Sequence, residues 1–219
     1  MTSPRTRITR LREKERVERS ALDALLDSTL VGHFALADPE RGPVAIPTAI
    51  VRDGDRILAH GSTGSRWMRA LAAGIPTCLA VTALDGLVVA RSAFESSLHY
   101  RSAVLFGCCA PLPEDEKADA LDLVTEALIP GRVAEIRRPS RRELEATLVL
   151  AFPIVEWSLK VSDGWPDDPP EDVAGDAWGG VLPLHTGYGR AVGAPDLREG
   201  ISLPASVQAL VDRSAGTGS

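Results

Sequence analysis

The feature that most restricts the fold of this chain is a series of short apolar segments separated by turn-forming residues. Segments 44–52 and 56–60 flank Asp53-Gly54-Asp55, and the apolar segment 31–37 precedes the turn-forming residues 38–43. An Asp-Gly pair between two short apolar segments is a strong signal for a β-hairpin. These residues therefore predict antiparallel strands that follow one another along the chain.

The same pattern continues toward the C-terminus, with a few helical segments between the strands. Further strands are predicted over residues 77–83, 87–92, 102–110, 147–153 and 155–161, with a turn at 84–86 and a polar loop at 93–99. Helices are predicted over residues 10–27, 66–73 and 113–128, and after Pro139, where Ser140 and Glu143 form a capping-box pattern. Since strands and helices do not alternate regularly, we predict a mainly β protein with peripheral helices, built as a small antiparallel barrel.

The chain is long enough for one sizeable core with appendages at both ends. Residues 1–28 are expected to carry an amphipathic helix that packs on the barrel, and residues 29–186 to form the barrel domain itself. Residues 163–177 are rich in Pro, Asp and Gly and predict a long loop. Residues 187–219 are expected to form a partly flexible tail with one short helix over 203–211.

Charge and composition exclude several classes of function. The formal net charge of −6 disfavours nucleic-acid binding, which needs clustered Lys and Arg. There is neither an apolar run of about 20 residues nor an apolar signal core, so we expect a cytoplasmic protein without membrane attachment. The three cysteines have no CxxC spacing and the four histidines have no HxxxH or HExxH spacing. Reduced thiols and no dedicated metal site are expected.

The segment from His60 to Arg66 carries the strongest chemical signal. A predicted strand ends, a Gly/Ser loop follows and a helix begins, which places backbone N–H groups where they can bind an anion. Hydroxyl groups and planar guanidinium groups add donors suited to phosphate. The alternative is a capped helix with arginines facing solvent. The candidate phosphate ligands are His60, Ser62, Thr63, Ser65, Arg66 and, one helical turn further on, Arg69.

A second polar group lies at the start of a strongly apolar strand. His99, Tyr100 and Arg101 directly follow the predicted polar loop. Loops often present polar residues to a ligand, so these side chains could face a cofactor or substrate. They could equally be a solvated cluster where the strand begins.

Several short motifs, in their order and spacing, resemble a known family. They are Ala45-Ile46-Pro47-Thr48, the segment His60–Arg66, Leu84–Val88, Tyr100–Val104, Pro130-Gly131-Arg132 and Trp178–Leu184. Over roughly residues 10–184 the chain resembles the pyridoxamine 5'-phosphate oxidase-like split-barrel flavoproteins. Within that family it is most similar to the flavin-nucleotide-binding branch, which includes nitroimidazole-resistance proteins.

The resemblance implies a homodimeric split β-barrel with FMN at the subunit interface. Ser65 and Arg66 match the family's phosphate-binding pair. Ile46, Pro47 and Thr48 fall on the strand that lines the flavin ring, and Tyr100, Arg101 and Ser102 fall on a strand that approaches its far edge. Trp178 matches an aromatic residue that the other subunit often supplies.

The sequence also departs from the oxidase pattern. Trp67 stands where the oxidases have a lysine, and the C-terminal arginine- and histidine-containing substrate motif is absent. Oxidation of pyridoxamine phosphate is therefore disfavoured.

The resulting expectation is an FMN-dependent oxidoreductase that passes electrons or hydride to a small electron-poor organic substrate. Three alternatives stay open. The chain could be a non-catalytic flavin-binding or sensing module, or a split barrel that binds haem or a deazaflavin, or a structural protein with an empty pocket. Haem would need an axial ligand, for which His99 and His33 are the candidates.

Overall fold

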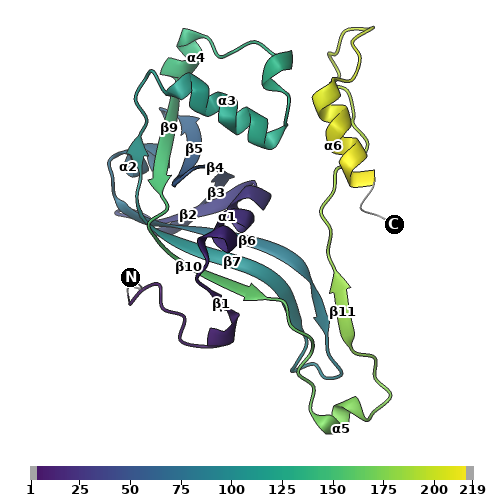
Figure 1. Ribbon diagram of the computed structural model, residues 1–219. Helices are drawn as coiled ribbons and strands as arrows, with labels where there is room; N and C mark the ends of the chain where they lie inside the picture. Colours follow the sequence, from purple (N-terminus) through teal and green to yellow (C-terminus); the bar gives the residue numbers. More distant parts are fainter. Residues whose placement is uncertain (1–3, 216–219) are drawn as a thin grey trace.

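The computed structural model describes residues 4–215, which form two antiparallel sheets with helices around them (Figure 1). The expected appendages 1–28 and 187–219 therefore lie in part outside the described residues. The larger sheet has the order β1 (Glu15–Arg16), β10 (Glu156–Ser162), β7 (Ser97–Cys108), β6 (Pro76–Val89), β2 (Val31–Asp38) and β3 (Gly42–Ala49), with β11 (Gly180–Pro183) pairing with β6. The smaller sheet has the order β4 (Val51–Asp53), β5 (Arg56–Ser62), β9 (Thr147–Pro153) and β8 (Ala110–Pro111).

The hydrophobic core lies between the two sheets. Phe34 on β2 and Phe152 on β9 are fully buried and meet edge to face, with their ring centroids 5.7 Å apart. Leu79 and Leu105 on the larger sheet and Ile57 on the smaller sheet belong to the same buried cluster. Side chains that alternate in and out along each strand build this core. The predicted mainly β antiparallel split barrel is confirmed.

The chain passes from the larger sheet to the smaller one at Ile50. The sequence predicts one strand over residues 44–52, but the structure divides it into β3 and β4 on either side of Ile50, which is buried. The Asp53-Gly54-Asp55 hairpin is confirmed, and Gly54 has the positive φ of 58° that such a turn favours. A bend at an apolar residue carries no turn signal, which explains why the division was not predicted.

The two strands predicted over residues 77–83 and 87–92 are one long strand, β6, with a bulge between Leu84 and Gly86. The Asp-Gly pair here makes a bulge and not a turn, because Arg101 holds the Asp85 carboxylate with two hydrogen bonds of 2.9 Å. A Cβ atom at Gly86 would lie 2.8 Å from the carbonyl oxygen of Leu182 on β11. The predicted polar loop 93–99 is also too long, since β7 begins at Ser97.

The predicted helix over residues 10–27 is wrong in its first half. Residues Arg12–Lys14 form a 3-10 turn (η1), Glu15–Arg16 pair with β10, and α1 begins only at Arg19 and ends at Ser28. Leu11 has a left-handed backbone and an exposed side chain, so its apparent helical periodicity with the leucines of α1 is accidental.

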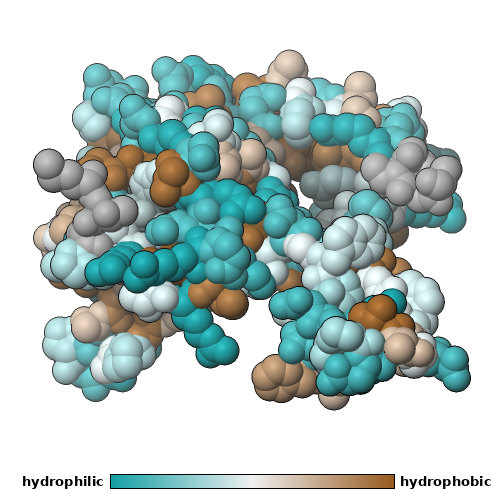
Figure 2. Space-filling model, turned by 60° about the horizontal axis from the view of Figure 1, so that its bottom comes forward, coloured by the Kyte–Doolittle hydropathy of each residue, from teal (hydrophilic) through white to brown (hydrophobic). Residues whose placement is uncertain are grey.

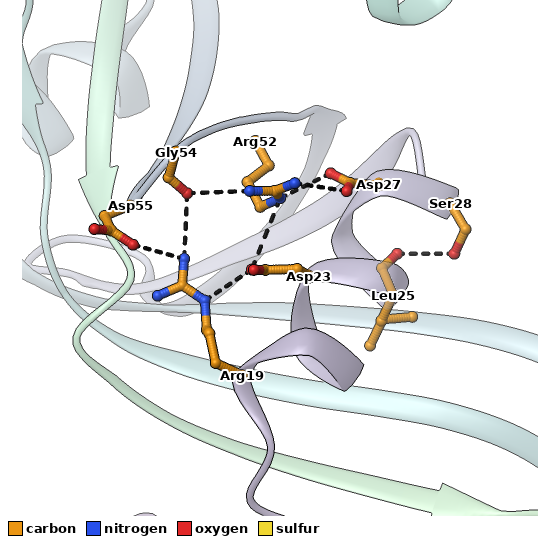
Figure 3. Close-up of polar contacts among 8 residues, drawn as sticks. All are labelled: Arg19, Asp23, Leu25, Asp27, Ser28, Arg52, Gly54 and Asp55. Atoms are coloured by element: carbon orange, nitrogen blue, oxygen red, sulfur yellow. Dashed lines mark hydrogen bonds and ion pairs between the residues drawn. The ribbon is translucent and has the colours of Figure 1, made fainter.

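The side chains of α1 divide between the core and an ion-pair network. Leu22, Leu25 and Leu26 are buried in the core. On the other side, Arg19 and Arg52 both contact Asp23, and Arg52 also binds Asp27 on the next turn (Figure 3). This network ties α1 to β4 and the hairpin that follows it.

Three short helices and one longer helix surround the smaller sheet. They are α2 (Arg66–Ala72), α3 (Lys117–Leu128), η2 (Val133–Glu135) and α4 (Arg141–Glu145), and Figure 1 shows α3 and α4 together at one end of β9. Leu58, Val149 and Ala120 form a second buried cluster where α3 packs on β5 and β9. The capping box of Ser140 and Glu143 is confirmed, as is the end of α2 near Gly74, which has a φ of 74°.

The C-terminal part runs beside the barrel (Figure 1). A short helix, α5 (Pro170–Val173), lies within the predicted loop, and β11 then pairs with β6. Residues 184–204, here called the strap, contain no helix or strand and lead to α6 (Ala205–Ala215). Ser206 anchors α6 by donating to Glu135 of η2 through its N–H, at 3.0 Å, and its hydroxyl, at 2.5 Å.

The strap leaves many apolar side chains exposed. They are Leu184, Tyr188, Val192, Leu197, Ile201 and Leu203. Figure 2 shows that apolar residues, in brown, also reach the surface among polar ones on the face turned forward. Within residues 4–215, no helix has the length and apolar character needed to cross a membrane.

Candidate functional site

The predicted anion-binding loop lies between β5 and α2, as expected from the sequence. The loop is closed by the Ser65 N–H, which donates to the Ser62 carbonyl at 3.0 Å, and by the Gly64 N–H, which donates to the Ser62 hydroxyl at 3.1 Å. Gly61 allows α2 to pack tightly on β5, because a Cβ atom there would lie 3.0 Å from Cγ of Met68. The loop is thus closed by hydrogen bonds among its own residues.

Some donors of this loop have partners and others do not. Thr63 is engaged, since its N–H donates to the Ala146 carbonyl at 3.0 Å and its hydroxyl donates to the same oxygen at 3.3 Å. Ser65 makes no side-chain capping bond. Among the described residues, Arg69 has no side-chain hydrogen bond or ion pair. The Ser65 hydroxyl and the Arg69 guanidinium are therefore available to an anion.

Arg66 is exposed but paired with two carboxylates of the β2–β3 turn. It contacts Glu40 at 2.8 Å and Asp38 at 3.0 Å, and the Glu40 hydrogen bond raises the pKa of Arg66. The Glu40 backbone N–H, with smaller contributions from Arg41 and Arg66, holds the pKa of Asp38 below its usual value. An anion at this loop must share Arg66 with these carboxylates, a competition that the sequence pattern did not indicate.

His60 lies on β5, two residues before Ser62. Its Nδ1 atom is buried without a hydrogen-bond partner, and burial lowers its pKa, which favours the neutral imidazole. Leu58, His60 and Ser62 alternate along β5 and so share one face of the strand, the face on which α3 packs against Leu58. His60 therefore stands between α3 and the loop.

The residues predicted to line a flavin ring point to both sides of β3. Ile46 packs against the core, so it offers a ligand outside the barrel only its main chain. Pro47 is exposed on the outer face, directly opposite His33 on β2, which is exposed as well. Thr48 follows Ile46 on the inner side of the strand.

Tyr100, Arg101 and Ser102 lie within β7 and not in a loop. Arg101 points inward and is neutralised by Asp85, while its third contact is the Ser28 hydroxyl at 3.1 Å. Ser102 shares a hydrogen bond of 3.2 Å with Thr82 on β6. The pairing partner of Arg101 was not predicted, because Asp85 was assigned to a turn.

Trp178 precedes β11 and its side chain is 68% exposed. Its ring lies over Gly180, where a Cβ atom would come within 2.8 Å of the ring, and Gly179 lies equally close to Arg91. Arg91 in turn binds Asp168, whose side chain is 1% exposed. The two glycines thus allow this part of the chain to pack close to the β6–β7 hairpin.

The structure brings the predicted phosphate ligands together but not the other predicted site residues. His60, Ser62, Thr63, Ser65, Arg66 and Arg69 belong to one strand–loop–helix unit. Among the described residues, no hydrogen bond or ion pair joins this unit to β7 or to Trp178. In a single chain the predicted site residues therefore fall in four places, which are the loop with α2, β3, β7 and the segment before β11.

Two cavities near these groups were not predicted. The first, of about 410 Å³, adjoins the loop and lies among α3, η2 and α4. The second, of about 480 Å³, lies between η1, the β6–β7 hairpin and residues 164–167, and its rim carries the highly exposed rings of Phe94 and Trp165. The arginine-rich segment 137–142 was the only sequence signal for the first cavity, and it was not interpreted as a site.

His99, a candidate haem ligand, lies beside the second cavity. Its Nε2 atom is 2.8 Å from the carbonyl oxygen of Gly164, which lines the cavity together with Ser97. Ser97 and His99 are two residues apart on β7, so their side chains share a face. Because a carbonyl can only accept, the Nε2–H group of His99 is the donor in this hydrogen bond.

These features define an antiparallel split-barrel protein with a candidate anion-binding loop between a strand of the smaller sheet and a short helix. Residues 18–161 match the family model described as pyridoxamine 5'-phosphate oxidase. The match spans more than half of the sequence, and the chain belongs to the pyridoxamine 5'-phosphate oxidase-like family.

Solved structures support this assignment. The chain is 51% identical to the FAD and haem binding protein from Mycobacterium smegmatis, with 90% of this chain and 97% of that chain covered and a TM-score of 0.86. It is 33% identical to the flavocytochrome Anf3 from Azotobacter vinelandii, with 95% and 97% covered and a TM-score of 0.87.

A third solved structure shares the fold only. It is described as a putative 5-nitroimidazole antibiotic resistance protein from Bacteroides thetaiotaomicron, and it is 16% identical with a TM-score of 0.57, over 67% of this chain and 86% of that chain. No curated protein sequence matches the chain.

Proposed function

We propose that this chain is a redox protein that binds FAD and a haem group. The observation that carries the proposal is the match, over nearly the whole of both chains, to two proteins described as an FAD and haem binding protein and as a flavocytochrome. The sequence led us to expect FMN, with haem as an alternative. The two relatives favour FAD over FMN and favour the haem alternative.

The residues of the loop fit a flavin phosphate. Ser62, Ser65 and Arg69 would hold it with hydroxyl and guanidinium donors, and Arg66 would join them by exchanging its carboxylate partners. When bound, the flavin supplies the transfer of electrons or hydride, while the protein positions it and tunes its electronics. The role of this chain's residues is to bind and orient the cofactor.

A histidine is also available for haem. Metal-binding histidines usually donate their second ring N–H to a carbonyl or carboxylate, which fixes the ring. His99 already has this arrangement through Gly164, with Nδ1 left as the ligand atom. His33 lies exposed on β2, and within residues 4–215 its ring has no such partner. We therefore prefer His99, and Phe94 and Trp165 would provide apolar surface for the porphyrin.

We further propose that the protein acts as a homodimer with the flavin at the subunit interface. The outer face of the larger sheet exposes Val31, His33 and Pro47 in neighbouring positions, and Trp178 is also exposed. A second copy packed on this face would bring together groups that stay apart in one chain. A small electron-poor molecule is the proposed acceptor of electrons.

The visible spectrum of the purified protein tests the proposal. We expect flavin bands and a Soret band after supply of FAD and haem, retained on dialysis. The Soret band should be lost in His99→Ala and kept in His33→Ala, which serves as the matched control. A protein that retains neither cofactor would refute the proposal, and loss of the Soret band in His33→Ala alone would move the haem ligand to the outer face.

A further inference from the structure

The cavity beside the anion-binding loop is part of the same region as the loop. Ser62, the last residue of β5, pairs directly with Thr147 on β9, and Thr147 lines the cavity. The hydroxyl of Thr147 donates to the carbonyl of Glu143 at 2.8 Å, while Thr63 of the loop is bonded to Ala146. The loop and the cavity are therefore adjacent, because Ser62 at the start of the loop pairs with a residue that lines the cavity.

The walls of the cavity combine apolar, cationic and acceptor groups. Leu121 and Thr125 come from α3, and Val133 from η2. Besides Thr147, the remaining wall consists of Asp122, Ile136, Arg137, Arg138, Pro139 and Glu143. Arginine side chains stack on aromatic rings and pair with phosphate, and carboxylates accept hydrogen bonds from ribose hydroxyls. A volume of about 410 Å³ lies within the range of small-molecule sites.

The two lining arginines are held in place by carboxylates. Arg137 makes hydrogen bonds of 2.8 and 2.7 Å to Glu143, and Arg138 contacts Asp122 at 2.8 Å and Asp119 at 2.6 Å. Each arginine is thus engaged by a carboxylate through its N–H groups, and both arginines line the cavity. A guanidinium group can still stack on a planar base while its N–H groups are paired in this way.

The cavity wall formed by η2 is hydrogen-bonded to the C-terminal helix α6. Glu135 of η2 accepts two hydrogen bonds from Ser206 of α6, and these bonds hold the pKa of Glu135 below its usual value. Its carboxylate also contacts Arg132 at 3.1 Å. The C-terminal helix therefore fixes the position of Val133 and Ile136 at the cavity.

We propose that this cavity binds the adenosine half of FAD, while the phosphate of the flavin half is held by the loop. The inference rests on the proposed function, because it assumes that the loop binds a flavin phosphate. It assigns the preference for a dinucleotide over FMN to residues 121–147, which lie outside the loop. The unpaired guanidinium of Arg69 would serve the phosphates between the two halves.

Dissociation constants for FAD and FMN, measured by flavin fluorescence on the full chain, test this assignment. Arg138→Ala removes a stacking surface and Ile136→Trp fills the cavity. In both variants we expect the dissociation constant for FAD to rise about tenfold, which is a loss of about 1.4 kcal/mol. That for FMN should stay within about twofold, because the loop is intact. AMP should compete with FAD and not with FMN.

Arg141→Ala is the matched control. Arg141 is a nearby arginine with a 93% exposed side chain paired with Glu145, and it does not line the cavity. This variant should bind both flavins as the parent chain does. The assignment would be overturned if the cavity variants lost equal affinity for FAD and FMN, or if the parent chain bound both flavins equally well. Either result would leave the proposal of flavin binding intact. A parent chain that binds neither flavin would overturn the proposed function together with it.

Discussion

Arg66 is a candidate phosphate ligand of the proposed flavin site, and its charge is shared with Glu40 and Asp38. Exposed ion pairs contribute little to stability, about 0 to 1 kcal/mol. The carboxylates therefore affect the fold less than they affect an incoming anion. By competing for the guanidinium group, they set how strongly Arg66 can bind a phosphate.

Substitutions of Arg66 and of Glu40 are expected to change the dissociation constant for flavin in opposite directions. Arg66→Ala removes a charge-assisted bond of about 1.5–3 kcal/mol and should raise the dissociation constant for flavin by about tenfold or more. Glu40→Gln frees Arg66 and should lower that constant. Fluorescence titration measures both, and unchanged binding in Arg66→Ala would place the phosphate elsewhere.

The buried thiol of Cys109 gives a prediction about pH. Burial, and to a lesser extent Cys108, raises the pKa of Cys109 to about 12. Because a raised pKa keeps the thiol protonated at every lower pH, Cys109 should resist alkylation at pH 8 in the native state. Mass spectrometry after brief iodoacetamide treatment should find it unmodified, and modified once the chain is unfolded in urea. Rapid native labelling of Cys109 would contradict its burial.

At the scale of elements, the bulge in β6 is where local sequence and tertiary packing disagree. Asp85-Gly86 has the composition of a turn, yet the strand continues because β11 and Arg101 occupy the space around it. Glycine is needed for close approach of another backbone, not for a turn.

Gly86→Ala tests this reading of the bulge. The added Cβ would meet the Leu182 carbonyl at 2.8 Å, so β11 must shift. We expect a loss of about 1–3 kcal/mol in the free energy of unfolding. Gly164→Ala is the control, since nothing lies within 4 Å of its Cβ position. Urea denaturation of the two variants should separate them, and equal stabilities would argue against the contact.

Elements with strong local signals were predicted well, and those set by distant contacts were not. The Asp53–Asp55 hairpin, the Ser140 capping box and strand β9 were predicted from adjacent residues. The short helical turn η1 and the break at Ile50 depend on packing between segments far apart in sequence. The loop of the candidate site is continuous in sequence and was found. The adjoining cavity is not continuous, because α3, η2, α4 and β9 meet only in the folded chain.

At the scale of the whole molecule, the outer face of the larger sheet is left uncovered in a single chain. Val31, His33 and Pro47 are exposed there, and the strap adds further exposed apolar side chains. Monomeric proteins seldom leave more than about 300–600 Å² of apolar surface in one patch. A second copy would cover such surface.

We therefore expect a dimer at micromolar concentration by light scattering. Ala80→Arg places a charge in the middle of the outer face, opposite His33, and should yield monomers that release flavin more readily. Val155→Arg, at an exposed position between β9 and β10, should leave the dimer intact. A monomeric parent chain that still retains flavin would refute the two-chain site.

The strap also has a mechanical consequence. It is fastened at one end by β11 on β6 and at the other by α6 on η2, at opposite ends of the barrel in Figure 1. Because the strap is attached at both ends, we expect a ligand that fixes η2 to restrict the positions open to β11 and to Trp178 beside it. Linkage of this kind is reciprocal. A partner that packs against Trp178 should therefore change the affinity of the protein for a ligand at η2 by the same factor. We therefore expect ligand binding at the two ends of the molecule to be thermodynamically linked.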